Sequence, residues 1–167
     1  PRITEDESWG SAPSVHYAGL TRTECEAELR QRKIRFDEVD EARGVVMPIR
    51  VKGPIGGVSY HTELPPEERA RSPYEIMDCR LALSLDDFSV ILKKHQIDEV
   101  QIFSAYRPPA KTWDRDKPAI RHPGGLAIDL RRFVKRDGSE EKDLVVLRDW
   151  TPSRDTPPCG PEQKKAG

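Results

Sequence analysis

The strongest constraint on the fold is a pair of segments, Cys79–His95 and Glu99–Tyr106, which follow one another closely in the chain. Apolar residues recur at helical spacing in the first segment: Leu81, Leu85, Phe88 and Leu92, with Ile91 beside them. A stripe of this kind predicts a helix that packs on another layer. The second segment alternates like a strand, and it ends at Arg107-Pro108-Pro109 because proline cannot donate a ladder hydrogen bond. Together the two segments predict an α+β fold.

Shorter elements are expected around this pair. A helix is predicted over 23–33, where Thr23 and Glu26 have the spacing of a capping box. Residues 45–51 indicate an edge or bulged strand, because Pro48 interrupts them. The other expected elements are a short strand over 58–61, a loop over 64–72, a strand over 126–130, and a hairpin turn at Asp137-Gly138 with a returning strand over 143–147. We expect a small, mostly antiparallel sheet with the first and main helices packed on one face.

The 167 residues are expected to form one domain with a modest core. Hydrophobic residues make up 35% of the chain and charged residues 34%, and the 15 prolines imply much irregular structure. A formal net charge of −1 provides no basic field, so nucleic acid is not an expected partner. No apolar run is long enough to span a membrane. We expect a tail or linker over 1–20, the folded domain over 21–160 and a frayed end over 161–167.

The candidate site lies in the segment 121–130, which runs from a polar turn into an alternating stretch. With a period of two, the aliphatic residues face one side and Asp129 faces the other beside the small Ala127. A Pro-Gly-Gly hinge follows His122 and allows this histidine to fold back over the strand. A histidine and a carboxylate brought together are two of the three protein ligands of a catalytic zinc site. The alternative is a surface histidine and a capping aspartate. His61 and Glu63 are a second candidate metal pair, but we expect them to lie in a solvated loop.

The segment fits the pattern His-x-x-Gly-x-Ala-x-Asp, with His122 and Asp129 at its ends. This pattern resembles the zinc D-alanyl-D-alanine carboxypeptidases and their hedgehog-type relatives. The wider context is similar to the bacterial extensin-like proteins. The blocks that carry this resemblance are 53–58 (GPIGGV), 78–83 (DCRLAL), 104–109 (SAYRPP), and, more weakly, Asp149-Trp150 and Cys159-Gly160. They occur in order across roughly residues 20 to 160, which is more specific than any single motif.

The resemblance implies a zinc ion held by His122, Asp129 and a later histidine, with an acid/base residue from the same late region. It implies that the element Ser104-Ala105-Tyr106-Arg107 lines the substrate site, and that Arg107 binds substrate or stabilises an oxyanion. The implied substrate is a peptide of the bacterial cell wall, cut at or near a D-amino acid. One secondary contact differs, because Ile120 stands where many of the carboxypeptidases have serine.

No histidine follows His122 in this sequence. We therefore expect the chain to lack the C-terminal part of the domain, which a second polypeptide or a further segment would supply. The expected function is that of a zinc metallohydrolase acting on peptidoglycan or another cell-wall polymer. The alternative is a non-catalytic cell-wall-binding or structural module on the same fold, because a fold does not determine a function.

The three cysteines, Cys25, Cys79 and Cys159, form no Cys-x-x-Cys pair, so a structural zinc knuckle is not expected. They suit either a reduced protein or long-range disulfides in an exported one. A Cys25–Cys79 disulfide would join the first helix to the main one and leave Cys159 for another partner. The chain begins at Pro1 and shows no signal peptide, which suggests a processed product, and we expect an exported protein of the periplasm or cell envelope.

Overall fold

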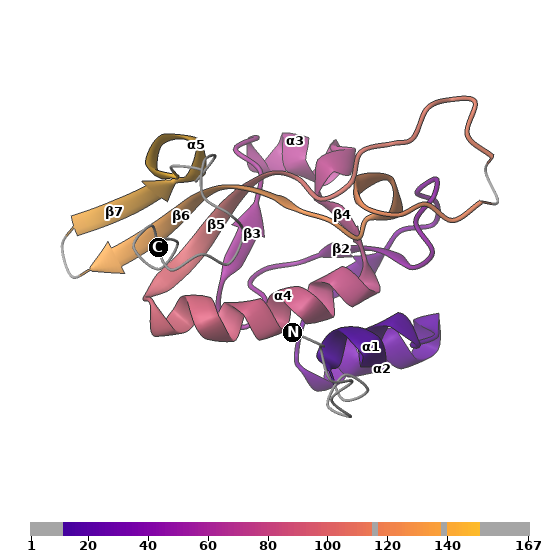
Figure 1. Cartoon of the computed structure of the whole chain (residues 1–167), viewed down its shortest axis with the longest axis horizontal. Coiled ribbons are helices and arrows are strands. Elements are labelled where there is room, and N and C mark those ends of the chain that lie inside the picture. Colours follow the sequence, from indigo (N-terminus) through magenta and orange to yellow (C-terminus); the bar gives the residue numbers. More distant parts are fainter. Residues whose placement is uncertain (1–11, 115–116, 138–139, 151–167) are drawn as a thin grey trace, which may run out of the picture.

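The computed structural model describes residues 12–114, 117–137 and 140–150, and it confirms the α+β class. Two small sheets lie beside one long helix, α4 (Figure 1). The first sheet is antiparallel and consists of β1 (Phe36–Glu38), β2 (Pro48–Val51) and β4 (Ile76–Asp78). The second has the order β3 (Ser59–His61), β5 (Ile97–Ser104), β6 (Asp129–Asp137), β7 (Glu140–Val145), with only the β3–β5 pair parallel. The helices are α1 (Pro13–Ala18), α2 (Arg22–Gln31), α3 (Pro66–Arg71), α4 (Cys79–Lys94) and α5 (Val146–Asp149), with 3-10 turns η2 (Pro73–Glu75) and η3 (His122–Gly124).

Helix α4 forms where the apolar stripe predicts it, and its buried face is the centre of the core. Asp78 caps its N-terminus by accepting a hydrogen bond from the backbone N–H of Arg80 at 3.1 Å. The buried residues are Cys79, Ala82, Leu83, Leu85, Ser89 and Leu92. The prediction was wrong for Ile91, whose surface is 52% exposed. The stripe is rotated toward the small Ala82 and Ser89, so Ile91 lies on the flank that faces solvent.

Helix α2 starts one residue earlier than predicted, and its capping threonine is Thr21 and not Thr23. Two Thr-x-x-Glu pairs overlap here, and the capping box is formed by Thr21 and Glu24. The Glu24 carboxylate accepts the Thr21 hydroxyl at 2.6 Å and the Thr21 backbone N–H at 2.8 Å, and these hydrogen bonds lower the pKa of Glu24. Thr21 Oγ1 also accepts the Glu24 N–H. Glu26 is instead 7% exposed and is paired with arginines at either end of the helix. The capping box therefore uses the first of the two pairs.

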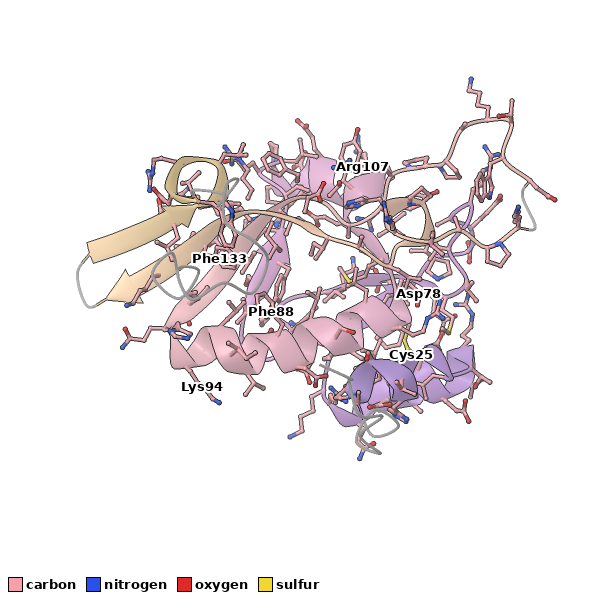
Figure 2. The ribbon with its side chains drawn as sticks, in the orientation of Figure 1. Cys25, Asp78, Phe88, Lys94, Arg107 and Phe133 are labelled. Atoms are coloured by element: carbon pink, nitrogen blue, oxygen red, sulfur yellow. A yellow bond between two sulfur atoms is a disulfide. The ribbon has the colours of Figure 1, made fainter. Side chains whose placement is uncertain are left out.

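The Cys25–Cys79 disulfide is present, with 6.2 Å between the two Cα atoms. It joins α2 to the first residue of α4, as Figure 2 shows near the label of Cys25. Disulfides of this kind are typical of exported proteins. Cys159 lies outside the described residues.

Part of the segment 1–20 belongs to the folded domain. Residues 13–18 form α1, and Tyr17 is only 5% exposed. Its hydroxyl donates to Asp87 of α4 at 2.7 Å and accepts from Arg32 at 2.8 Å. Burial and the Asp87 hydrogen bond raise the pKa of Tyr17. Residues 1–11 and 151–167, which include the predicted frayed end, lie outside the described residues.

Several predicted elements differ from the structure. Strand β2 is the middle strand of its sheet and not an edge strand, because Pro48 is its first residue and needs no ladder donor there. Residues 66–71 form α3 where a loop was expected, with Pro66 in the first turn, a position that suits proline. Strand β6 begins at Asp129 and not at Leu126, because its partner β5 ends at Ser104, the residue opposite Asp129. Strands β6 and β7 pair antiparallel as expected, but β7 covers Glu140–Val145 and not 143–147, because Val146–Asp149 form α5. The predicted turn includes Gly138, which lies outside the described residues.

Candidate functional site

Arg107, His122 and Asp129 lie together at one end of the second sheet. Asp129 is the first residue of β6, and Arg107 follows the end of β5 by three residues. His122 Nε2 is 3.1 Å from Asp129 Oδ1, and the Arg107 guanidinium donates to Asp129 Oδ2. The Arg107 backbone N–H also donates to the His122 carbonyl at 3.2 Å. Arg107 is labelled in Figure 2. The structure thus brings together Arg107, His122 and Asp129, three of the five residues that were predicted for the site.

The turn that holds His122 is fixed by close backbone packing. Gly125 has φ +64°, and its carbonyl accepts the Asp78 backbone N–H at 2.9 Å. A Cβ on Gly125 would lie 2.7 Å from the Asp78 nitrogen, so only glycine fits. Arg121, just before the histidine, has φ 54° and ψ −139°, a sparsely populated region that costs about 1–3 kcal/mol. Its carbonyl accepts the Leu126 N–H at 2.9 Å, which helps to hold this conformation.

The hydrogen bonds of His122 determine what its ring can bind. Nδ1 is 3.3 Å from the Ala105 carbonyl, which can only accept, so Nδ1 carries the proton in this contact. In the neutral ring Nε2 then presents a lone pair to the Asp129 carboxylate, which is itself only an acceptor. Two lone pairs facing one another require a proton or a metal cation between them. The Nδ1 contact to a backbone carbonyl is the usual partner of a metal-binding histidine.

The geometry fits two ligands of one zinc ion. Ligand atoms at about 2.0–2.1 Å in a tetrahedral site lie roughly 3.3 Å apart, close to the observed separation of 3.1 Å. Arg107 occupies the other Asp129 oxygen and orients the carboxylate, as an outer-shell partner does. Within the described part of the chain, no group of three or more His, Cys, Asp or Glu side chains could hold a metal ion. The pair could supply two of the three protein ligands that a catalytic zinc site normally has.

Ser104 and Tyr106 do not share the surface of this cluster. Ser104 is 3% exposed, and its Oγ accepts from Arg107 Nε at 2.9 Å, so it positions the guanidinium. Tyr106 is 4% exposed, its hydroxyl donates to the Arg43 carbonyl at 3.0 Å, and burial raises its pKa. In this structure neither side chain has an open surface to contact a substrate.

The second candidate metal pair is not formed. His61 Nε2 is 3.2 Å from Glu99, and Nδ1 is 2.8 Å from the Thr62 carbonyl. Glu63 is bound instead by the Arg131 guanidinium. His61 and Glu63 are therefore bound to different partners in this structure.

Two supporting residues were not predicted from the sequence. Asp78 is fully buried, and its carboxylate accepts the Met47 N–H at 3.2 Å and two Arg80 guanidinium N–H groups. The Arg43 guanidinium binds three carbonyls of the loop after Arg107, those of Ala110, Lys111 and Trp113, at 3.3, 3.1 and 2.7 Å. The position of Asp78 directly before a long apolar stripe was the available signal, because aspartate is a preferred N-cap.

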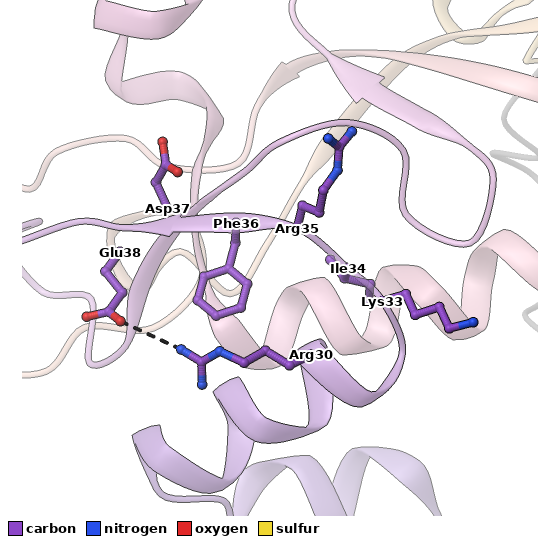
Figure 3. Close-up of a pocket in the computed structure, with 7 residues that line it drawn as sticks. All are labelled: Arg30, Lys33, Ile34, Arg35, Phe36, Asp37 and Glu38. Atoms are coloured by element: carbon purple, nitrogen blue, oxygen red, sulfur yellow. Dashed lines mark ion pairs between the residues drawn. The ribbon is translucent and has the colours of Figure 1, made fainter.

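Three hollows matter for placing a ligand. One of about 730 Å³ lies between the end of α2 and β1, and Figure 3 shows its lining with the Arg30–Glu38 ion pair. A second, of about 500 Å³, adjoins Asp129 and is mostly apolar. Its other lining residues are Phe103, Ile128, Leu130, Phe133, Val146 and Trp150. A third, of about 410 Å³, lies between β2, β3 and α3.

No protein-family model, curated protein or solved structure matches this chain significantly. Among the described helices, none combines the length and the apolar character needed to cross a membrane.

Proposed function

We propose that this chain contributes His122, Asp129 and Arg107 to a zinc-dependent hydrolase that acts on peptides of the bacterial cell wall. The observation that carries the proposal is the His122 Nε2–Asp129 Oδ1 pair, 3.1 Å apart, with Nδ1 anchored on a backbone carbonyl. The ordered motif blocks that resemble the extensin-like and carboxypeptidase families support the substrate class. The disulfide supports an exported protein, and the proposal places it in the periplasm or cell envelope.

Each residue has a role that follows from its contacts. His122 and Asp129 would hold the metal. Zinc bound there would polarise the scissile carbonyl of the substrate and lower the pKa of a bound water to about 7. Arg107 keeps Asp129 oriented through one Nη2 donor and is itself held by Ser104. Three of its five N–H donors remain, and its side chain is 53% exposed. These donors can bind a substrate carboxylate or stabilise an oxyanion.

A third ligand and an acid/base residue complete this proposal. A catalytic zinc site normally has three protein ligands, and the described residues bring two together. The remaining groups would come from outside the described residues, or from a second polypeptide.

A non-catalytic cell-wall-binding module is the second candidate. This candidate is favoured because the described residues bring together two side chains that could bind a metal, and not three. In this case the Arg107–Asp129–His122 cluster is a polar network that recognises the polymer without cutting it.

Zinc stoichiometry by elemental analysis tests the two candidates. The measurement compares this chain with a longer natural polypeptide that contains it, each with and without His122→Ala. For the hydrolase we expect about one zinc per polypeptide in the longer form, lost in His122→Ala and retained in the matched control His61→Ala. Retention of zinc in His122→Ala would contradict the assigned ligands. Absence of zinc from both unmutated forms would favour the module.

A further inference from the structure

The hollow between β2, β3 and α3 contains cations that lack acidic partners. Its charged lining residues are Arg50, Lys52, Arg69 and Glu75, with His61 also present. Within the described residues, neither Arg50 nor Arg69 has a carboxylate at ion-pair distance, whereas Lys52 pairs with Asp37 at 2.8 Å.

Arg50 is held in place without being neutralised. Its Nη1 donates to the Arg69 carbonyl at 3.0 Å and its Nη2 to the Ser72 carbonyl at 2.7 Å. Both acceptors are neutral, so three N–H donors and the full positive charge remain. Burial lowers the pKa of Arg50, and nearby Glu75 and Asp37 oppose this shift only in part. A partly buried cation that lacks a paired anion is unfavourable, and an anionic ligand relieves this cost.

The acid on the wall of this hollow is already engaged. Glu75 Oε1 accepts both the backbone N–H and the hydroxyl of Thr62, each at 2.7 Å. His61 is engaged with Glu99 and the Thr62 carbonyl. Lys52 is neutralised by Asp37, so the lining has two unpaired arginines and one carboxylate. Its net charge is therefore +1.

We propose that this hollow is a binding site for a phosphate group, held between Arg50 and Arg69. A planar guanidinium that is fixed by two carbonyls is preorganised to donate to several oxygens of one compact anion. The volume of about 410 Å³ is within the range of small-ligand sites, so a phosphate ester fits as well as free phosphate. The site shares no residue with the His122–Asp129 pair, and it does not depend on the proposed hydrolase function.

Titration with inorganic phosphate at constant ionic strength tests this site. Binding is measured by calorimetry and by the NMR amide shifts of residues 50–75. Helix α3 supplies a matched pair of variants, because Arg69 lines the hollow whereas Arg71, two residues on, is exposed and does not. We expect Arg69→Gln to raise the Kd for phosphate by about tenfold or more, the loss of one charged hydrogen bond, and Arg71→Gln to leave it unchanged. Phenyl phosphate in place of inorganic phosphate separates an ester ligand from the free ion.

Three outcomes would overturn the assignment. Equal losses in the two variants would show that α3 attracts anions only through its overall charge. Acetate binding as tightly as phosphate would show that the site does not select phosphate. Absence of saturable binding would exclude the site. The variant His122→Ala is expected to bind phosphate normally, so failure of the metal proposal leaves this result unaffected. Arg50→Gln is a secondary variant, because Arg50 also holds the end of α3.

Discussion

At the scale of single residues, the position of His122 depends on glycine at 125. The Gly125 backbone packs against Asp78, at the junction of β4 and α4, and its φ is +64°. The histidine turn is thereby joined to a fully buried residue, so the core helps to position the His122 ring.

Gly125→Ala should destabilise the protein by about 3 kcal/mol, the sum of a left-handed backbone cost and an overpacked contact. Gly57→Ala is the matched control, because Gly57 has φ +82° but its nearest neighbour to an added Cβ is the flexible Lys93 at 3.8 Å. It should lose only the backbone cost of about 1–2 kcal/mol. Urea unfolding of both variants checks the difference. Equal losses of unfolding free energy in the two variants would show that the contact with Asp78 adds nothing to the cost of the substitution.

The contacts between His122 and Asp129 and between Ser104 and Arg107 could be predicted because these residues are close in sequence. His122 and Asp129 are seven residues apart and Ser104 and Arg107 three apart, so the motif alone indicates their proximity. The burial of Tyr106 could not be predicted in the same way. It depends on a hydrogen bond from the Tyr106 hydroxyl to the carbonyl of Arg43, which lies 63 positions earlier in the chain.

At the scale of elements, the disulfide holds α2 against α4. The two cysteines are 54 positions apart, a separation for which loop closure predicts about 4 kcal/mol of stabilisation. Reduction should therefore lower the free energy of unfolding by up to about this amount, measured by urea unfolding with and without dithiothreitol. The variant Cys25→Ser/Cys79→Ser should be as unstable as the reduced protein and insensitive to reductant. Unchanged stability on reduction of the unmutated chain would contradict the prediction.

Helix α4 could be predicted and α3 could not, for a reason that lies in their burial. Six residues of α4 are buried and recur at helical spacing, whereas α3 buries none of its six residues and so carries no apolar period. The start of α2 was ambiguous because two capping pairs overlap. Strand β6 was placed too early because Leu126 and Ile128 continue the alternation of the strand without pairing to β5.

At the scale of the whole molecule, α1 is part of the domain. Arg32 holds it there, with Nη2 on the Tyr17 hydroxyl and Glu28, and Nη1 on Asp86 and Asp87 of α4. The proposed phosphate site also depends on the whole fold. Its two arginines come from β2 and α3, so no local sequence motif indicates it.

Tyr17→Ala should destabilise the full chain by about 2–3 kcal/mol, because it removes a buried ring and its hydrogen bonds. Val15→Ala is the matched control on the same helix. Val15 is 52% exposed, and its truncation should change the free energy of unfolding by less than about 0.5 kcal/mol. Thermal and urea unfolding measure both. If Tyr17→Ala were as mild as the control, residues 13–18 would contribute no stability to the domain.

The hydrogen bond between the Arg107 N–H and the His122 carbonyl brings the two ends of the intervening loop together. The Ala119 N–H on the Gly44 carbonyl secures the same region from the other side. Segments whose ends already meet tolerate changes of length, because the cost of closure grows slowly with the number of residues. Evolution can therefore lengthen, shorten or replace this loop to alter selectivity while the two residues at its base keep their separation. The same property makes it a suitable position for grafting a recognition peptide.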